Sequence, residues 1–199
     1  MTQQHFDLRQ VPAASWKNGG GATRELACWP PGADMEHFDW RVSVATIAQS
    51  GPFSRFAGVD RVITLLTGDG VYLRQPQVGI DHRLDRALEP FAFAGDGGMD
   101  CDLLGSTSED FNLMTRRGVW RGAVQVLRSH ALLSARPAGL LLALRGTWAM
   151  EPLAASSGQG VVLAPDEGCW WADEDFGWNA APVVGVGDNV LLHVVLEPA

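Results

Sequence analysis

The chain has 199 residues, of which 46% are hydrophobic, so it can bury the core of one large domain or of two small domains that share an interface. Its formal net charge of −8 argues against nucleic-acid binding, because affinity for a phosphate backbone needs a basic surface or stripe. The sequence has no run of 18 apolar residues and no signal-peptide pattern at its start, so we expect a soluble, cytoplasmic protein without a membrane partner.

Short apolar or alternating runs separated by glycine-rich turns dominate the sequence. Turns such as 67–70, 95–98, 156–158 and 185–189 are typical of an antiparallel all-β protein. No segment keeps an apolar 3.6-residue period over three turns, so helix is limited to a turn or two near Val59 or Asp110. The predicted strands cover residues 40–47, 61–66, 71–74, 90–93, 113–114, 123–127, 140–145, 160–164, 169–172 and 190–196.

Residues 16–25 contain three consecutive glycines among hydrogen-bonding side chains, and Lys17 is the only lysine of the chain. Glycine has no Cβ, so it lets a ligand approach the backbone or allows a positive φ. Lys17, Asn18, Thr23 and Arg24 can supply polar contacts around such an opening. The segment fits either the rim of a site for a small polar ligand or a tight corner between strands whose polar residues satisfy the loop backbone.

The predicted strand at 40–47 alternates in character. A period of two places Arg41, Ser43 and Ala45 on one face and the apolar residues on the other. If this face lines a barrel, the small Ala45 leaves space while Arg41 and Ser43 point donors inward, as a carboxylate pocket requires. The alternative is that the polar face is exposed to solvent.

Arg61 opens the next predicted strand directly after Asp60. It forms either an exposed ion pair with Asp60, which is the usual role of a surface arginine, or an inward contact with a ligand. Phe53 and Phe56 precede this strand, and we expect them to pack one end of a barrel.

Asn112 lies between apolar residues in the segment 110–114, and a buried amide must find partners. It either satisfies a turn or contacts a ligand at the floor of a pocket.

A faint internal repeat predicts two barrels. Residues 63–73 lead to 88–93, and residues 141–150 lead to 163–170; each half consists of a strand, a glycine turn, a strand and a proline-marked entry to another strand. This order is typical of a cupin-like jelly roll, so we expect an all-β bicupin, with a single large β-sandwich as the alternative. The first barrel would span 1–118 and the second 119–199, with a boundary near 118–122 and an N-terminal segment that crosses to the second barrel.

Four segments resemble the HutD/Ves family and occur in the order which that family shows: residues 16–25, 39–45, 51–61 and 110–114. From about residue 120 onward the likeness rests on length and strand pattern. The resemblance implies the bicupin fold and an inward role for Arg61. It also implies an association with histidine utilisation, with formylglutamate or urocanate as the ligand.

Signatures of metal binding and of nucleophilic catalysis are missing from the sequence. Metal-binding cupins use an H-x-H pair, a glutamate and a distant histidine, because a divalent ion needs three or four converging donors. His82 stands where the first member of such a pair would be, but the second member is absent. We therefore expect no metal and no other cofactor, and His82 is either a ligand contact or a surface residue. There is also no G-x-S-x-G elbow and no P-loop.

These observations predict a metal-free bicupin that binds a small anionic metabolite and acts in regulation. The alternatives are a metal-independent isomerase or hydrolase acting on a small organic acid, with His82 or Lys17 as acid–base group, and a protein-interaction module that uses exposed tryptophans. The sequence leaves the oligomeric state open, and a homodimer is one of the options. The predicted ligand-binding residues are Lys17, Asn18, Thr23, Arg24, Arg41, Ser43, Arg61, His82 and Asn112.

Overall fold

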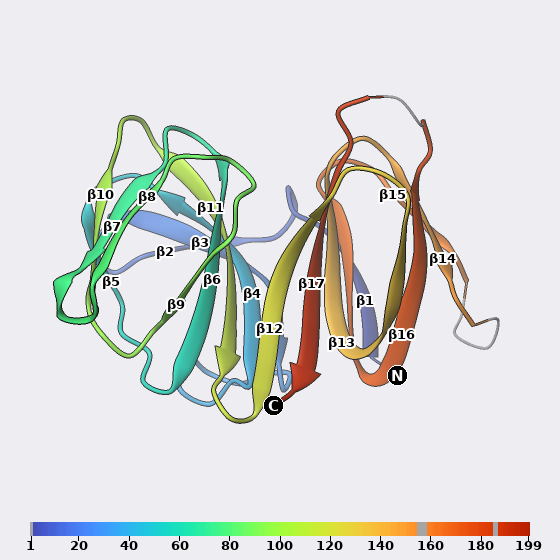
Figure 1. The fold of residues 1–199 in the computed structure, drawn as a ribbon, viewed down its shortest axis with the longest axis horizontal. Helices are drawn as coiled ribbons and strands as arrows, with labels where there is room; N and C mark the ends of the chain where they lie inside the picture. The colour runs from blue at the N-terminus through green and yellow to red at the C-terminus, as the bar shows by residue number, and fades with distance from the viewer. Residues whose placement is uncertain (1, 155–158, 185–186) are drawn as a thin grey trace. The chain divides into compact units, whose positions relative to one another are not determined.

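The computed structural model describes residues 2–154, 159–184 and 187–199, and it confirms the expected all-β class (Figure 1). Within these residues the only helical element is a short 3-10 turn, Pro76–Val78. Val59 and Asp110, near which helical turns were considered, belong instead to strands β6 and β11. The predicted turn 156–158 and residues 185–186 of the turn 185–189 lie outside the described residues.

The described strands lie in two compact units. Unit 2 comprises residues 12–121 with Ala199, and unit 1 comprises residues 2–11 with 122–198. The strands of unit 2 are β2 (Ala13–Ser15), β3 (Gly21–Trp29), β4 (Trp40–Ile47), β5 (Gly51–Phe53), β6 (Val59–Thr67), β7 (Val71–Gln75), β8 (Ile80–Leu84), β9 (Phe91–Ala94), β10 (Met99–Leu103) and β11 (Ser108–Arg116). Those of unit 1 are β1 (Thr2–Asp7), β12 (Trp120–Leu127), which begins at the unit boundary, β13 (Ala131–Arg145), β14 (Trp148–Pro152), β15 (Val161–Leu163), β16 (Glu167–Pro182) and β17 (Val190–Pro198).

Unit 2 is built from two antiparallel sheets, and the larger of the two apolar clusters described in it lies between them. One sheet has the strand order β2-β3-β4-β11-β6-β9 and the other β5-β10-β7-β8. Ile47 and Ile63 from the first sheet pack in one cluster with Leu73, Leu84 and Cys101 from the second. The strand predicted at 40–47 is β4, and its central place between β3 and β11 puts its inward face in the middle of this sheet.

The register of the first sheet brings polar side chains from four strands onto one face. Ser43 of β4 lies opposite Glu25 of β3 and Asn112 of β11. One row further along, Met114 of β11 lies opposite both Arg41 and Arg61. Because residues opposite each other in antiparallel strands share a face, these side chains gather on the inner side of the sheet.

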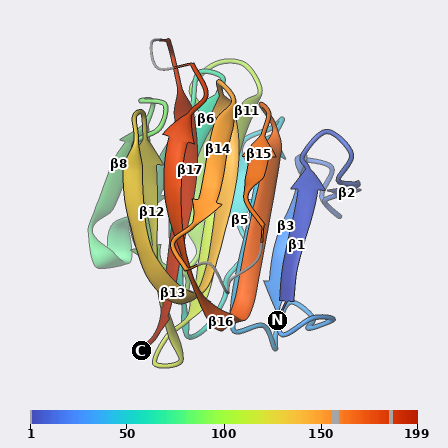
Figure 2. The same cartoon turned by 90° about the vertical axis from the view of Figure 1, so that its right-hand side faces the viewer.

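Unit 1 has a seven-stranded sheet in the order β12-β17-β13-β16-β14-β15, with β1 attached to β16. β1 runs antiparallel to β16 from Thr2 opposite Ala172 to Asp7 opposite Glu167 (Figure 2). The interior of this unit is filled by large aromatic side chains, including Trp148, Trp171 and Trp178, which are at most 2% exposed. None of the described segments forms a helix that could cross a membrane.

Candidate functional site

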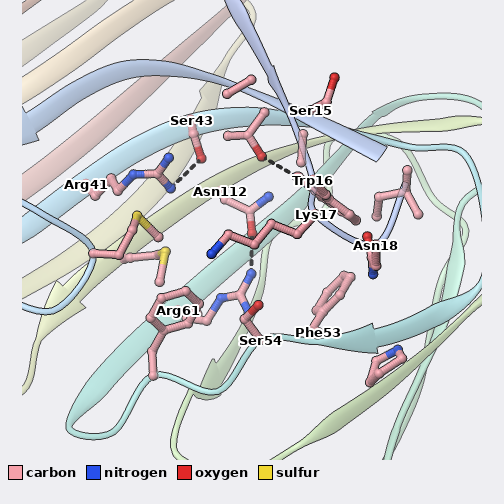
Figure 3. Close-up of a pocket in the computed structure, with 18 residues that line it drawn as sticks. Ser15, Trp16, Lys17, Asn18, Arg41, Ser43, Phe53, Ser54, Arg61 and Asn112 are labelled. Carbon is pink, nitrogen blue, oxygen red and sulfur yellow. Dashed lines mark hydrogen bonds between the residues drawn. The ribbon is translucent and has the colours of Figure 1, made fainter. Parts of the chain in front are cut away.

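A cavity of about 480 Å³ opens into unit 2 and collects most of the predicted ligand-binding residues (Figure 3). It is lined by strand side chains of the first sheet and by the segments 14–18 and 52–56. Seven of the nine predicted residues lie on its wall: Lys17, Asn18, Thr23, Arg41, Ser43, Arg61 and Asn112. That they bind a ligand remains a prediction.

The glycine segment is both a tight corner and the rim of this cavity. Gly19 has φ +72°, and its N–H donates to the Trp16 carbonyl over 3.0 Å, so the chain reverses there. A Cβ at Gly21 would collide with the Thr46 carbonyl oxygen, so only glycine lets β3 start this close to β4. The turn leaves Lys17 exposed, with its side chain pointing into the space that Arg41 and Arg61 border (Figure 3).

The alternating face of β4 lines the cavity through Arg41, Ser43 and Ala45, and Arg41 is only 9% exposed. Its location excludes the solvent-facing alternative for this strand. Arg41 donates from Nε to Glu25 Oε2 over 2.6 Å and from Nη1 to Ser43 Oγ over 3.4 Å. Glu25 is about half exposed, so one guanidinium edge of Arg41 is held from the outside of the cavity while the rest faces inward.

Arg61 is the most deeply buried cation of the site. Its guanidinium lies 5.0–5.8 Å from the ring centres of Phe53, Phe56 and Phe93, and Nη2 donates to Asn112 Oδ1 over 2.8 Å. Nε has no hydrogen-bond partner, and no described carboxylate forms an ion pair with Arg61. Burial lowers the pKa of Arg61 to about 10, so its positive charge is retained at neutral pH without a counter-charge.

The exposed ion pair considered for Asp60 and Arg61 does not form. Asp60 instead accepts from Arg117, which also binds Asp96. The Asp60 carboxylate is therefore paired with Arg117 on the outside of the barrel. This arrangement leaves Arg61 free to turn inward from the start of β6.

Asn112 lies on the floor of the cavity and forms hydrogen bonds both to Arg61 and to the backbone of its own strand, β11. Its Oδ1 accepts from Arg61, and its Nδ2 donates to the Asp110 carbonyl over 3.3 Å. The side chain of Asp110 itself is fully buried, with Oδ2 accepting from Ser108 Oγ over 3.3 Å and Oδ1 lacking a partner. Desolvation raises the pKa of Asp110 to about 7.

Two of the predicted residues lie away from the cavity, which corrects the predicted site. Arg24 follows Thr23 directly in β3, and because neighbouring strand residues point to opposite faces it is not on the cavity wall. His82 lies in β8, where its ring stacks on Phe91 at 3.7 Å between ring centres. His82 is thus a packed residue of the second sheet, and it is excluded as the acid–base group of this cavity.

Sequence reasoning missed some residues of the cavity wall and interpreted others only as packing residues. Trp16 forms part of the wall and donates from Nε1 to Thr23 Oγ1 over 2.8 Å, although it begins the glycine segment itself. Phe53 and Phe56 were expected only to pack a barrel end, but they line the cavity and surround Arg61. Met35 also lines it, from a loop without any sequence signal.

The charge of the cavity wall has one sign. Lys17, Arg41 and Arg61 line it, and no aspartate, glutamate or histidine does so among the described residues. Within the same part of the chain, no group of three or more His, Cys, Asp or Glu side chains is arranged to hold a metal ion. The arrangement suits a ligand with negatively charged oxygens, which guanidinium groups bind through directed hydrogen bonds.

Comparisons with known proteins agree with this architecture. The HutD family model matches residues 8–187. Protein Ves of Cronobacter sakazakii is 37% identical over 171 residues, which cover 85% of this chain and 87% of that protein. A conserved Pseudomonas aeruginosa protein of unknown function has a crystal structure that superimposes with a TM-score of 0.85 at 30% identity, covering 99% of this chain and 100% of the other.

Two further structures define the fold. HutD from Pseudomonas fluorescens has a TM-score of 0.78 at 24% identity, with all of both chains covered. A Cupin 2 conserved barrel domain protein from Leptotrichia buccalis has a TM-score of 0.61 at 7% identity, covering 98% of this chain and 96% of that one. The expected fold of two cupin-like barrels is thereby confirmed.

Proposed function

Because the chain belongs to the HutD family, we propose that its unit 2 cavity binds a small anionic metabolite and that the protein regulates histidine utilisation without turning over a substrate. The observation that carries this proposal is Arg61. It holds a positive charge that is buried, surrounded by aromatic rings and not neutralised by any described carboxylate.

A buried, unpaired charge is costly, and proteins keep one where a partner of opposite charge completes the site. Arg61 faces a cavity whose charged wall residues, within the part of the chain that the structure describes, are all cations, so we infer that the missing partner is an anion that enters from solution. A carboxylate in the cavity can accept from the Arg61 guanidinium, in which Nη2 is the nitrogen that Asn112 engages among the described residues.

Arg41 supplies a second anchor on the neighbouring side of the cavity. It lies in β4, while Arg61 lies in β6, and β11 with Asn112 separates the two strands. Two guanidinium groups on either side of a polar floor suit a dicarboxylate. Formylglutamate is the dicarboxylate that the family resemblance suggests, and urocanate offers one carboxylate and a ring.

Binding is tested with N-formyl-L-glutamate and urocanate by thermal shift and isothermal titration calorimetry. We expect Arg61→Gln to weaken binding by about 10- to 100-fold, because a hydrogen-bonded charge contributes about 1.5–3 kcal/mol and each 1.4 kcal/mol is about tenfold. Arg24→Gln is the matched control: it removes the same charge from β3 but lies off the cavity, so affinity should not change. Equal losses in both variants, or no loss in Arg61→Gln, would contradict the proposal.

Lys17 keeps the enzyme alternative testable, since its amine lines the same cavity. After incubation with each ligand, mass spectrometry of the small molecules distinguishes the two functions. Recovery of unchanged ligand supports a binding protein. Conversion that disappears in Lys17→Arg would instead assign an enzyme with Lys17 as its reactive group.

A further inference from the structure

We propose that the cavity binds its anionic ligand most tightly when the buried carboxyl group of Asp110 is protonated, so that binding at neutral pH is accompanied by partial proton uptake at Asp110. This inference rests on the proposed function and names how that site responds to pH. Asp110 does not itself line the cavity, so its role is to adjust the affinity of the site and not to contact the ligand.

The position of Asp110 beside the cavity comes from the strand register. Ala45, which lines the cavity, lies directly opposite Asp110 across β4 and β11, and such neighbours have Cβ atoms about 5 Å apart. Asn112, on the cavity floor, is two residues along the same strand and therefore on the same face. An anion in the cavity thus comes within about 10 Å of the Asp110 carboxyl group, which is itself fully buried.

The surroundings of the Asp110 carboxyl group disfavour its ionised form. It is 0% exposed, its Oδ1 has no partner, and Oδ2 accepts only the 3.3 Å hydrogen bond from Ser108. Arg61 donates to Asn112, and no ion pair between Arg61 and Asp110 occurs among the described residues. Burial accordingly raises the pKa of Asp110 to about 7, so both forms exist at neutral pH.

The groups around Asp110 leave it as the one that titrates near neutral pH. On its own strand, Glu109 adds a like charge that favours the protonated form. Across the barrel, Cys101 of β10 is held neutral, because burial raises the pKa of its thiol to about 12. The cross-strand neighbours of Asp110, Ala45 and Leu65, are apolar, and Arg61 on the cavity wall remains charged.

A negative ligand repels the ionised form of Asp110, so binding favours its protonation and raises its pKa further. By linkage, affinity is highest at a pH low enough for Asp110 to be protonated already, and it falls as the pH rises above about 7. With two charges about 8–10 Å apart at an effective dielectric constant of about 20, the dissociation constant should increase about tenfold or more between pH 6 and pH 9.

The test is calorimetric titration of N-formyl-L-glutamate, whose carboxylates stay ionised across this range. At pH 7 the heat is measured in two buffers of different ionisation enthalpy, because their difference gives the number of protons taken up. The wild-type protein should take up a fraction of a proton. Asp110→Asn, which resembles the protonated form, should take up none and should bind at pH 9 as tightly as the wild type binds at pH 6.

Two further variants separate this role from a structural one. Ser108→Ala removes the hydrogen bond that favours the charged form, so the fall in affinity should move to higher pH. Glu109→Gln is the matched control on the adjacent residue, and proton uptake should persist in it. Binding without proton uptake, or uptake that survives in Asp110→Asn, would overturn the inference alone, whereas no binding at any pH would overturn the proposed function.

Discussion

Arg61 and Asp110 are two buried ionisable side chains that do not neutralise each other. Arg61 donates to an amide oxygen, and Asp110 accepts from a hydroxyl. Asn112 lies between them in the register, with its Oδ1 on Arg61 and its Nδ2 on the Asp110 backbone carbonyl. The neighbouring strands β6 and β11 therefore hold one cation without a counter-charge and one acid that can bind a proton. Burying both groups costs folding free energy, but it suits a site that must respond to an anion.

Asp110 should make the stability of the ligand-free protein fall with rising pH. Its folded pKa of about 7 lies above the unfolded value near 3.8, so the native state binds more protons between these values and its stability decreases as pH rises from about 4 to 7. At about 1.4 kcal/mol per pKa unit, the loss is a few kcal/mol. Urea unfolding at pH 5 and pH 8 should show that Asp110→Asn removes most of this loss.

The comparison must be made between the two proteins at each pH, because other acids act in the opposite direction. Arg9 and Arg117 hold the pKa values of Asp7 and Asp96 at about 2, so the stabilisation that these ionised groups give is lost as the pH falls below about 4. If wild type and Asp110→Asn lose stability equally between pH 5 and pH 8, the assignment of this titration to Asp110 is wrong.

At the residue scale, sequence reasoning could identify Arg41 but not decide Arg61. The alternation of 40–46 is a local pattern, and it placed Arg41, Ser43 and Ala45 on the face that the structure turns to the cavity. Arg61 shares a face of β6 with the buried Ile63 and Leu65, whereas Asp60 points to the other face and binds Arg117. Because residues 61–66 carry apolar side chains on both faces, the sequence does not tell which face of this strand is the inner one.

At the scale of elements, alternation along β3 decides which polar residues can act together. Thr23 lines the cavity, so its neighbour Arg24 cannot share that face within a regular strand. Past Glu25 the register of β3 against β4 shifts, and this irregularity cannot be derived from the sequence. The sequence therefore contained enough to separate Thr23 from Arg24, but not enough to foresee that Glu25 would hold Arg41.

Strand β1 pairs with β16 along its whole length and packs most closely on it at Gly168, opposite Phe6. A Cβ on Gly168 would collide with the Phe6 ring and with the Leu141 carbonyl oxygen, which as backbone cannot yield easily. We expect Gly168→Ala to lower the free energy of unfolding by about 1–3 kcal/mol, as overpacking does, and to speed hydrogen exchange in β1.

Gly98→Ala serves as the control for this change, since a Cβ there meets no atom within 4 Å. Its stability should stay within about 0.5 kcal/mol of the wild type. An equally small effect of Gly168→Ala would show that β1 is not held against β16 as the structure describes.

At the scale of the whole molecule, the two barrels differ in what fills them. Unit 2 has an open cavity with a cationic wall, whereas the interior of unit 1 is occupied by Trp148, Trp171 and Trp178. The internal repeat in the sequence predicted two similar barrels. It could not predict that unit 2 keeps a cavity with a cationic wall while aromatic side chains fill the core of unit 1, because this depends on how large side chains from separate strands meet.

We expect a binding stoichiometry of one, because the cavity with the cationic wall lies in unit 2. Calorimetric titration with N-formyl-L-glutamate should give one ligand per chain, and Arg61→Gln should remove that single event. A second binding event that survives in Arg61→Gln would show that unit 1 also offers a site.

The pairing of β1 with β16 has a consequence for how the chain is made. β1 precedes all of unit 2, and its partner strand follows it, so about 160 residues separate Gln4 from Trp170, opposite which it lies. During synthesis, residues 12–121 can fold as soon as they leave the ribosome, while β1 must wait unpaired until β16 emerges. The order of translation therefore favours completion of the cavity-bearing barrel before the barrel to which the first strand belongs.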